Sequence, residues 1–180
     1  MRSGNLIFSF FAALLLSGCA SFKLKPFDAQ DFRSASREQR VRAYERYEVQ
    51  RALPSGLRVQ DQTIWGYGWP YRMADYFRES GDEASAEKME GGFSWMMWGA
   101  AGGLAALFLG EYLAAQEYRS GSGDWSATRN LGFAGAGLGL CVEIGGAFVA
   151  FDSAPNSFNR YLSGQLALTA TSQVEAAPAK

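Results

Sequence analysis

Two long apolar segments rich in small residues constrain this chain more than any other feature. They cover residues 93–115 and 131–151, and each is close to the ~20 residues that cross a bilayer as one helix. The segment between them, residues 116–130, is polar and contains a Ser-Gly-Ser-Gly sequence. Two helices joined by a polar turn form a helical hairpin, so we predict a glycine-rich hairpin over residues 91–152.

Glycine spacing predicts how the two helices of this hairpin pack. Two pairs have the GxxxG spacing, others recur every seven residues, and the glycines assigned to helix packing are Gly99, Gly103, Gly135, Gly139 and Gly146. In a helix these spacings form a groove almost without side chains, which another helix can approach closely. Each interior glycine costs about 1 kcal/mol relative to alanine in water, so close packing must offset that cost.

Two acidic residues interrupt the apolar segments. Glu143 lies on the same helical stripe as Gly139 and Gly146 and should therefore face the partner helix, whereas Glu111 lies nearer the polar turn. A charged side chain at mid-bilayer costs roughly 2.5–3.5 kcal/mol or more, so such residues usually face protein or water. We expect Glu143 to be a protonated or hydrogen-bonded clasp at the helix interface.

The sequence is compatible with two environments for the hairpin. Segment length, the small-residue face and the aromatic flanks Trp95, Trp98, Tyr112 and Trp125 favour insertion into a membrane. The alternative is a buried hairpin inside a soluble helical domain.

The N-terminus has the three-part layout of an export signal. Arg2 supplies a positive start, residues 6–16 form a short apolar run, and two small residues come directly before Cys19. The run is shorter than a permanent membrane span, so we expect residues 1–18 to be a removed signal peptide.

The sequence Leu16-Ser17-Gly18-Cys19 resembles the lipobox of bacterial lipoproteins. The resemblance implies that the Cys19 thiol carries diacylglycerol, that the chain is cut before it, and that the new N-terminus is acylated. Two or more acyl chains hold a protein stably on a bilayer. Ala20, a residue other than aspartate, implies the outer membrane facing the periplasm, whereas a spanning helical hairpin favours the inner membrane.

A weaker resemblance concerns the hairpin together with the lipobox. The pairs Gly99/Gly103 and Gly135/Gly139 make the chain loosely similar to glycine-zipper lipoproteins of bacterial outer membranes, although the long three-glycine repeats of that family are absent. This resemblance implies a structural role in the cell envelope.

Composition excludes several kinds of chemistry. The chain has no histidine, and once Cys19 is acylated Cys141 is its one thiol. Zinc sites of the Cys/His kind, disulfides within the chain, and Ser-His-Asp or Cys-His catalysis are therefore excluded. Loss of residues 1–18 removes one arginine and no acid, which changes the net charge from −1 to −2 and speaks against nucleic-acid binding. We expect no enzyme activity, no metal and no cofactor other than the lipid on Cys19.

A helix is predicted to begin after Ser36. Ser36 and Gln39 form a capping box, and the run of helix formers continues to Leu53, before Pro54-Ser55-Gly56. One stripe of this helix contains Arg37, Arg40, Tyr44, Tyr47 and Arg51. The stripe is either a solvated face or a surface lying against anionic head groups.

Aromatic residues alternate over residues 63–71. Trp65, Tyr67, Trp69 and Tyr71 fall on one face if this segment is extended. They could stack on the sugar rings of a glycan, or they could lie at a water–lipid boundary or in a core. Pro70 and the intervening glycines favour a bent loop over a flat strand.

The remaining segments complete a mostly α-helical prediction. We expect a short helix over residues 73–77, a break at Ser80-Gly81, and another helix from Asp82 through Met89 into the glycines that follow. Pro155 can begin a last amphipathic helix, whose apolar side contains Phe158, Tyr161, Leu162 and Leu166.

These expectations define six regions. They are a signal peptide (1–18), a lipid-anchored linker (19–35), a periplasmic helical and aromatic region (36–90), the hairpin (91–152), a C-terminal amphipathic helix (153–166) and a disordered tail (167–180). The predicted function is a structural or assembly role in the envelope, through close helix packing with copies of the chain or with another envelope protein. A periplasmic glycan-binding module is the alternative, and an enzyme of unrecognised type ranks third.

Overall fold

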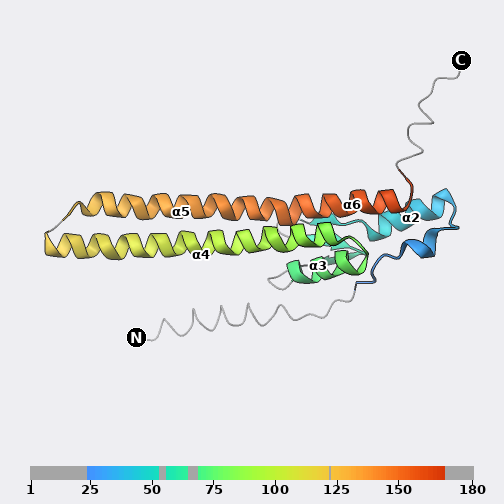
Figure 1. Cartoon of the computed structure of the whole chain (residues 1–180), viewed down its shortest axis with the longest axis horizontal. Helices are drawn as coiled ribbons and strands as arrows, with labels where there is room; N and C mark the ends of the chain where they lie inside the picture. Colours follow the sequence, from blue (N-terminus) through green and yellow to red (C-terminus); the bar gives the residue numbers. More distant parts are fainter. Residues whose placement is uncertain (1–23, 53–55, 65–68, 122, 169–180) are drawn as a thin grey trace, which may run out of the picture. The chain divides into compact units, whose positions relative to one another are not determined.

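The computed structural model describes residues 24–52, 56–64, 69–121 and 123–168. The chain divides into two compact units (Figure 1). The described residues up to Met89 and from Phe151 onward form one, which we call the mixed unit, and the described residues from Glu90 to Ala150 form the other, which we call the hairpin. The predicted fold class is confirmed, because the described chain is mostly α-helical and contains a closely packed pair of long apolar helices.

The mixed unit combines short helices with a small sheet. In chain order its elements are η2 (Ala29–Phe32), α2 (Arg37–Tyr47), β1 (Gln50–Ala52), β2 (Gly56–Val59), β3 (Gln62–Ile64), α3 (Trp69–Glu79), the first residues of α4 (Glu83–Ser120), the end of the π-helical η3 (Val149–Ser153), and α6 (Ala154–Gln165). The hairpin consists of the rest of α4 and of α5 (Trp125–Phe148), which lie side by side in Figure 1.

The sheet was not predicted from the sequence. Its three strands are antiparallel in the order β1-β2-β3, and Leu57 pairs with Arg51 on one side and Ile64 on the other. Gln60 and Asp61 turn the chain between β2 and β3 with positive φ angles of 49° and 60°. Tight two-residue hairpins usually place Asn or Gly at such positions, so the turn gave little signal in the sequence.

Helix α2 begins where expected and ends earlier than expected. Both hydrogen bonds of the Ser36–Gln39 capping box are present, at 3.3 Å and 2.9 Å. The prediction that this helix continues to Leu53 is wrong, because Glu48 is extended and the chain then enters β1. The side-chain amide of Asn159 in α6 accepts from the Val49 N–H at 2.8 Å and donates to its carbonyl at 2.9 Å.

The core of the mixed unit lies between the helices and the sheet. The rings of Phe77 and Phe158 stack with centroids 4.6 Å apart. Leu57 from β2, Met73 from α3 and Leu162 from α6 are fully buried with them. The apolar side expected for the last helix is therefore the side that packs.

A sharp turn connects α3 to α4 at the predicted break. Gly81 has a φ of +88°, and a Cβ atom there would lie 2.8 Å from the Tyr161 hydroxyl oxygen, so glycine suits this position for two reasons. Asp82 then accepts a hydrogen bond from the Ser85 N–H at 3.1 Å and caps α4.

Helix α4 is longer than expected. Two consecutive glycines, Gly91 and Gly92, do not interrupt it, and α4 runs for 38 residues without a break. The turn of the hairpin is correspondingly shorter than residues 116–130, because α4 continues to Ser120 and α5 begins at Trp125.

Candidate functional site

Small residues form the contact surface between the two hairpin helices. Gly99, Gly103 and Gly110 of α4 face Gly139, Ala136 and Gly132 of α5, and we call this surface the glycine seam. Gly92 and Gly146 extend it towards the end of α5. The helices lie so close along the seam that backbone atoms of one contact backbone atoms of the other.

Distances along the seam leave no room for a side chain. A Cβ atom placed on Gly139 would lie 2.5 Å from Gly103 Cα and 2.6 Å from the Gly99 carbonyl oxygen. One placed on Gly110 would lie 2.5 Å from Gly132 Cα. Gly135 also turns towards α4, since its Cβ would lie 2.7 Å from Ala106 Cβ. All five glycines assigned to helix packing thus lie between the two helices of one chain.

Glu143 lies beside the seam at the level of Gly99. A Cβ atom on Gly99 would lie 2.5 Å from the Glu143 backbone nitrogen. The Glu143 side chain is partly buried, and no hydrogen bond or ion pair connects its carboxyl group to another described residue. The structure therefore places Glu143 at the predicted helix contact, but among the described residues its carboxyl group has no partner for the predicted clasp.

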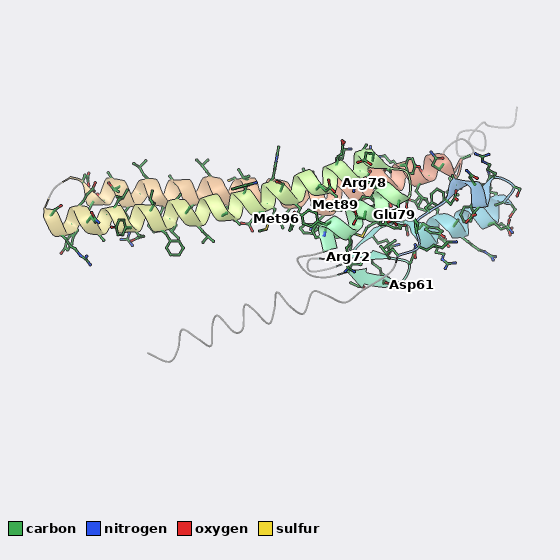
Figure 2. The ribbon with its side chains drawn as sticks, turned by 60° about the horizontal axis from the view of Figure 1, so that its bottom comes forward. Asp61, Arg72, Arg78, Glu79, Met89 and Met96 are labelled. Atoms are coloured by element: carbon green, nitrogen blue, oxygen red, sulfur yellow. The ribbon has the colours of Figure 1, made fainter. Side chains whose placement is uncertain are left out.

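Large apolar side chains cover the outside of the hairpin. Trp98 is 73% exposed and Phe108 is 70% exposed on α4, and Leu138 is 70% exposed on α5. Figure 2 shows side chains projecting outward along the length of both helices. The exposed large apolar residues of the hairpin are Trp95, Met97, Trp98, Leu104, Phe108, Leu109, Tyr112, Leu113, Tyr118, Trp125, Leu131, Phe133, Leu138, Leu140, Val142, Ile144 and Phe148.

No polar stripe accompanies these apolar side chains. Between Glu90 and Glu111, α4 contains one polar residue, Ser94, and between Asn130 and Asp152 the second segment contains one charged residue, Glu143. A surface helix of a soluble protein normally keeps one polar face, whereas a helix that is apolar all round is surrounded by other protein or by lipid. Two helical segments, Glu83–Ser120 and Trp125–Gln165, also meet the length and hydropathy of membrane spans, and only 22% and 11% of their 18-residue apolar windows are buried.

The apolar stretches of the two helices begin and end at matching levels. Gly110, just before Glu111, packs against Gly132, just after Arg129 and Asn130. At the other end Gly92, just after Glu90, packs against Ala150, shortly before Asp152. Each stretch is therefore about 30 Å long at 1.5 Å per residue.

The turn end of the hairpin, residues 111–130, is closed by polar interactions, and we call it the tip. Arg129 Nε lies 2.8 Å from Glu111 Oε1, and the Thr128 hydroxyl donates to Glu117 at 2.8 Å. Asp124 caps α5, and the hydrogen bond from the Ser126 hydroxyl, together with the Ala127 N–H, lowers the pKa of its carboxyl group.

The predicted lipidation and aromatic sites have different outcomes. Cys19, Trp65 and Tyr67 lie outside the described residues. The backbone of Trp69 and Tyr71 belongs to the first turn of α3, so this part of the aromatic segment is helical and not extended. The condition for a one-sided aromatic face, an extended segment, is therefore not met in its C-terminal half, because the helix that buries Met73 and Phe77 begins at Trp69.

The predicted arginine and tyrosine stripe is not a single face. Tyr47 is buried in the core and Arg51 lies on β1, because α2 ends at Tyr47. Sequence reasoning instead missed a hollow of about 570 Å³ beside α2, whose lining includes Lys25, Asp31, Phe32, Arg42 and Arg46. The Lys25–Asp31 ion pair, at 3.7 Å, partly neutralises it, and its residues come from segments that only the fold brings together.

Comparisons with known proteins add no family. No family model, curated protein or solved structure matches the chain. Within the described ranges, His, Cys, Asp and Glu side chains form no group of three or more suited to a metal ion. The hairpin is therefore the feature of the described chain that bears most directly on function.

Proposed function

We propose that this protein is a lipid-anchored, non-catalytic protein of the bacterial cell envelope whose hairpin is embedded in a membrane, where it has a structural or assembly role. Cys19 provides the lipid anchor in this proposal, on the strength of the lipobox resemblance. The observation that carries the membrane part is the distribution of side chains on the hairpin: small residues inside and large apolar residues on every outer side.

Lipid fits this distribution better than water or a second helix pair in water. Removal of apolar surface from water is favourable by about 25 cal/mol of free energy per Å². In a soluble dimer, each hairpin would cover only one side of the other. Apolar side chains on the remaining sides, drawn from residues such as Trp98, Phe108 and Leu138, would stay exposed to water. Hydrocarbon covers all sides at once, and glycine is common at helix contacts within membranes.

The role in assembly follows from which surfaces remain available. The glycine seam is occupied within one chain, so a partner helix would meet the outer apolar surface of the hairpin. The partner is another copy or another envelope protein, and the membrane is either the outer or the inner one. Ala20 favours the outer membrane and the spanning length of the hairpin favours the inner membrane, so density-gradient separation of the two membranes is the deciding measurement.

Alkaline carbonate extraction tests the embedded hairpin. The variant to compare with the wild type is residues 20–180 exported behind an ordinary cleavable signal peptide, so that neither lipid nor leader holds the chain. We expect this variant to stay in the membrane pellet. Its release into the soluble fraction would refute embedding and leave lipid as the sole attachment.

A matched control uses charge on the outer surface. In the same lipid-free chain, Leu104→Lys with Leu138→Lys adds two charges to exposed apolar positions without entering the glycine seam. Each charge near mid-bilayer costs roughly 2.5–3.5 kcal/mol, so we expect most of the doubly substituted chain in the soluble fraction. For the anchor, labelled palmitate should be incorporated by the wild type and not by Cys19→Ala.

A further inference from the structure

The hairpin carries two bands of aromatic side chains separated by an apolar stretch. Trp95 and Trp98 form one band on α4, and both are exposed. Tyr112, Tyr118 and Trp125 form the other band near the tip, where the rings of Tyr118 and Trp125 meet edge to face at 5.9 Å. Trp and Tyr concentrate at the two boundaries between membrane and water.

The spacing of these bands matches one bilayer. At 1.5 Å per residue, Trp98 and Tyr112 are about 21 Å apart along α4, and Trp95 and Tyr118 are about 35 Å apart. These values bracket the ~30 Å hydrocarbon core of a bilayer. The charge-free stretches on both helices have the same length, and their ends lie at matching levels.

We propose that the hairpin crosses the whole bilayer, so that the tip, residues 111–130, emerges on the face opposite to the mixed unit. The proposal rests on the proposed function, because it requires the hairpin to be embedded. It adds a direction and a depth: the two aromatic bands lie at opposite boundaries of the bilayer, and the apolar parts of α4 and α5 between the bands lie in hydrocarbon.

Two shallower placements conflict with the structure. A helix lying in the plane of the boundary needs a polar face directed to water, and neither hairpin helix has one. A hairpin that stopped inside the bilayer would leave the charged tip in hydrocarbon, including Glu117, Arg119 and Asp124. Emergence on the far side lets water reach these groups, while the Glu111–Arg129 pair, about half exposed, lies at the boundary.

Two engineered thiols, one in the mixed unit and one at the tip, test whether the hairpin crosses the bilayer, because a crossing places them on opposite sides of the membrane. The full lipidated chain carries Cys141→Ser, which removes the thiol within the apolar stretch, together with Ser34→Cys in the mixed unit and Ala127→Cys at the tip. Both added positions are exposed. The protein is reconstituted in sealed phosphatidylethanolamine/phosphatidylglycerol vesicles and treated from outside with a membrane-impermeant maleimide. Mass spectrometry then counts adducts for each chain.

The crossing predicts one adduct per chain, at Ser34→Cys or at Ala127→Cys according to orientation, and two after detergent opens the vesicles. Chains with two adducts, or with none, before detergent have both sites on one side and would overturn the proposal. Such a result combined with membrane retention of the lipid-free chain leaves the proposed function intact. Release of the lipid-free chain by carbonate would instead refute the proposed function itself.

Protease digestion of the wild type provides a second test that needs no substitution. Trypsin outside the vesicles should cut a given chain either at the tip, after Arg119, or within the mixed unit, but not at both. Fragments cut at both places in sealed vesicles would contradict the crossing.

Discussion

Glycine has opposite roles at neighbouring positions of α5. Gly139 lies in the glycine seam, where a Cβ atom would meet the α4 backbone, whereas Gly137 faces outward and has no atom within 4 Å of an added Cβ. The intrinsic helix propensity of glycine is equally poor at both positions. Only tertiary contact therefore distinguishes a required glycine from a replaceable one.

Alanine substitution should separate these two glycines. We expect Gly139→Ala to lower the free energy of unfolding by about 1–3 kcal/mol, because the contacts at 2.5–2.6 Å are with backbone atoms that cannot move aside. We expect Gly137→Ala to raise it by up to about 1 kcal/mol through helix propensity. Unfolding of the detergent-solubilised chain by SDS titration measures both, and equal effects would argue against the glycine seam.

At the scale of elements, a side chain of α6 sets where the sheet begins. Asn159 binds both the N–H and the carbonyl of Val49, which comes directly before β1. An amide side chain can donate and accept at once, so it imitates the edge of a neighbouring strand. The C-terminal helix thus fixes a strand more than a hundred residues earlier in the chain.

Loss of this amide should destabilise the mixed unit. Asn159→Ala leaves two part-buried backbone groups of Val49 without partners, at an expected cost of about 1–3 kcal/mol each. Asn156→Ala, an exposed position on the same helix, is the matched control and should change stability little. Urea unfolding followed by circular dichroism compares the two, and similar losses for both variants would show that the Val49 contacts do not matter.

At the scale of the whole molecule, the two units bury opposite kinds of residue. The mixed unit places its large apolar side chains inside, such as Phe77 and Phe158, whereas the hairpin places small residues inside and large ones outside. The first arrangement suits water and the second suits lipid. In the proposed function, one chain therefore carries one part in water and one part in lipid.

The stability of the mixed unit should fall at alkaline pH. Burial raises the pKa of Tyr76 above its ordinary value of 10.0, and burial together with the charge of Asp82 raises the pKa of Tyr161. Each of these tyrosines stays neutral in the folded chain at a pH where it already ionises in the unfolded chain. Its contribution to stability is therefore complete below about pH 10 and is lost as the pH rises through the pKa of the folded state.

Urea unfolding at a series of pH values tests this linkage. Tyr76→Phe should weaken the decline in unfolding free energy above pH 10, whereas Tyr71→Phe, at an exposed position of the same helix, should leave it unchanged. A decline that is identical in wild type and Tyr76→Phe would rule out this tyrosine as its source.

The sequence by itself determined those features that depend on local periodicity and capping. The hairpin, its contact glycines, the capping box at Ser36 and the break at Gly81 all appear in the sequence, because helix pitch fixes which residues share a face. These features depend on residues that are only a few helical turns apart in the sequence. The same periodicity placed Glu143 on the side of its helix that faces the partner helix, and the structure shows that its neighbour there is Gly99.

Only the tertiary structure decided the features that depend on distant partners. The sheet, the end of α2 at Tyr47 and the start of α3 at Trp69 each differ from the local pattern, which favoured a longer helix and a bent aromatic loop. Contacts across the chain, such as Asn159 with Val49, outweigh propensities of less than about 1 kcal/mol per residue. Local signals are strong where one helix repeats a pattern many times, and weak where short strands and helices obtain their stability from one another.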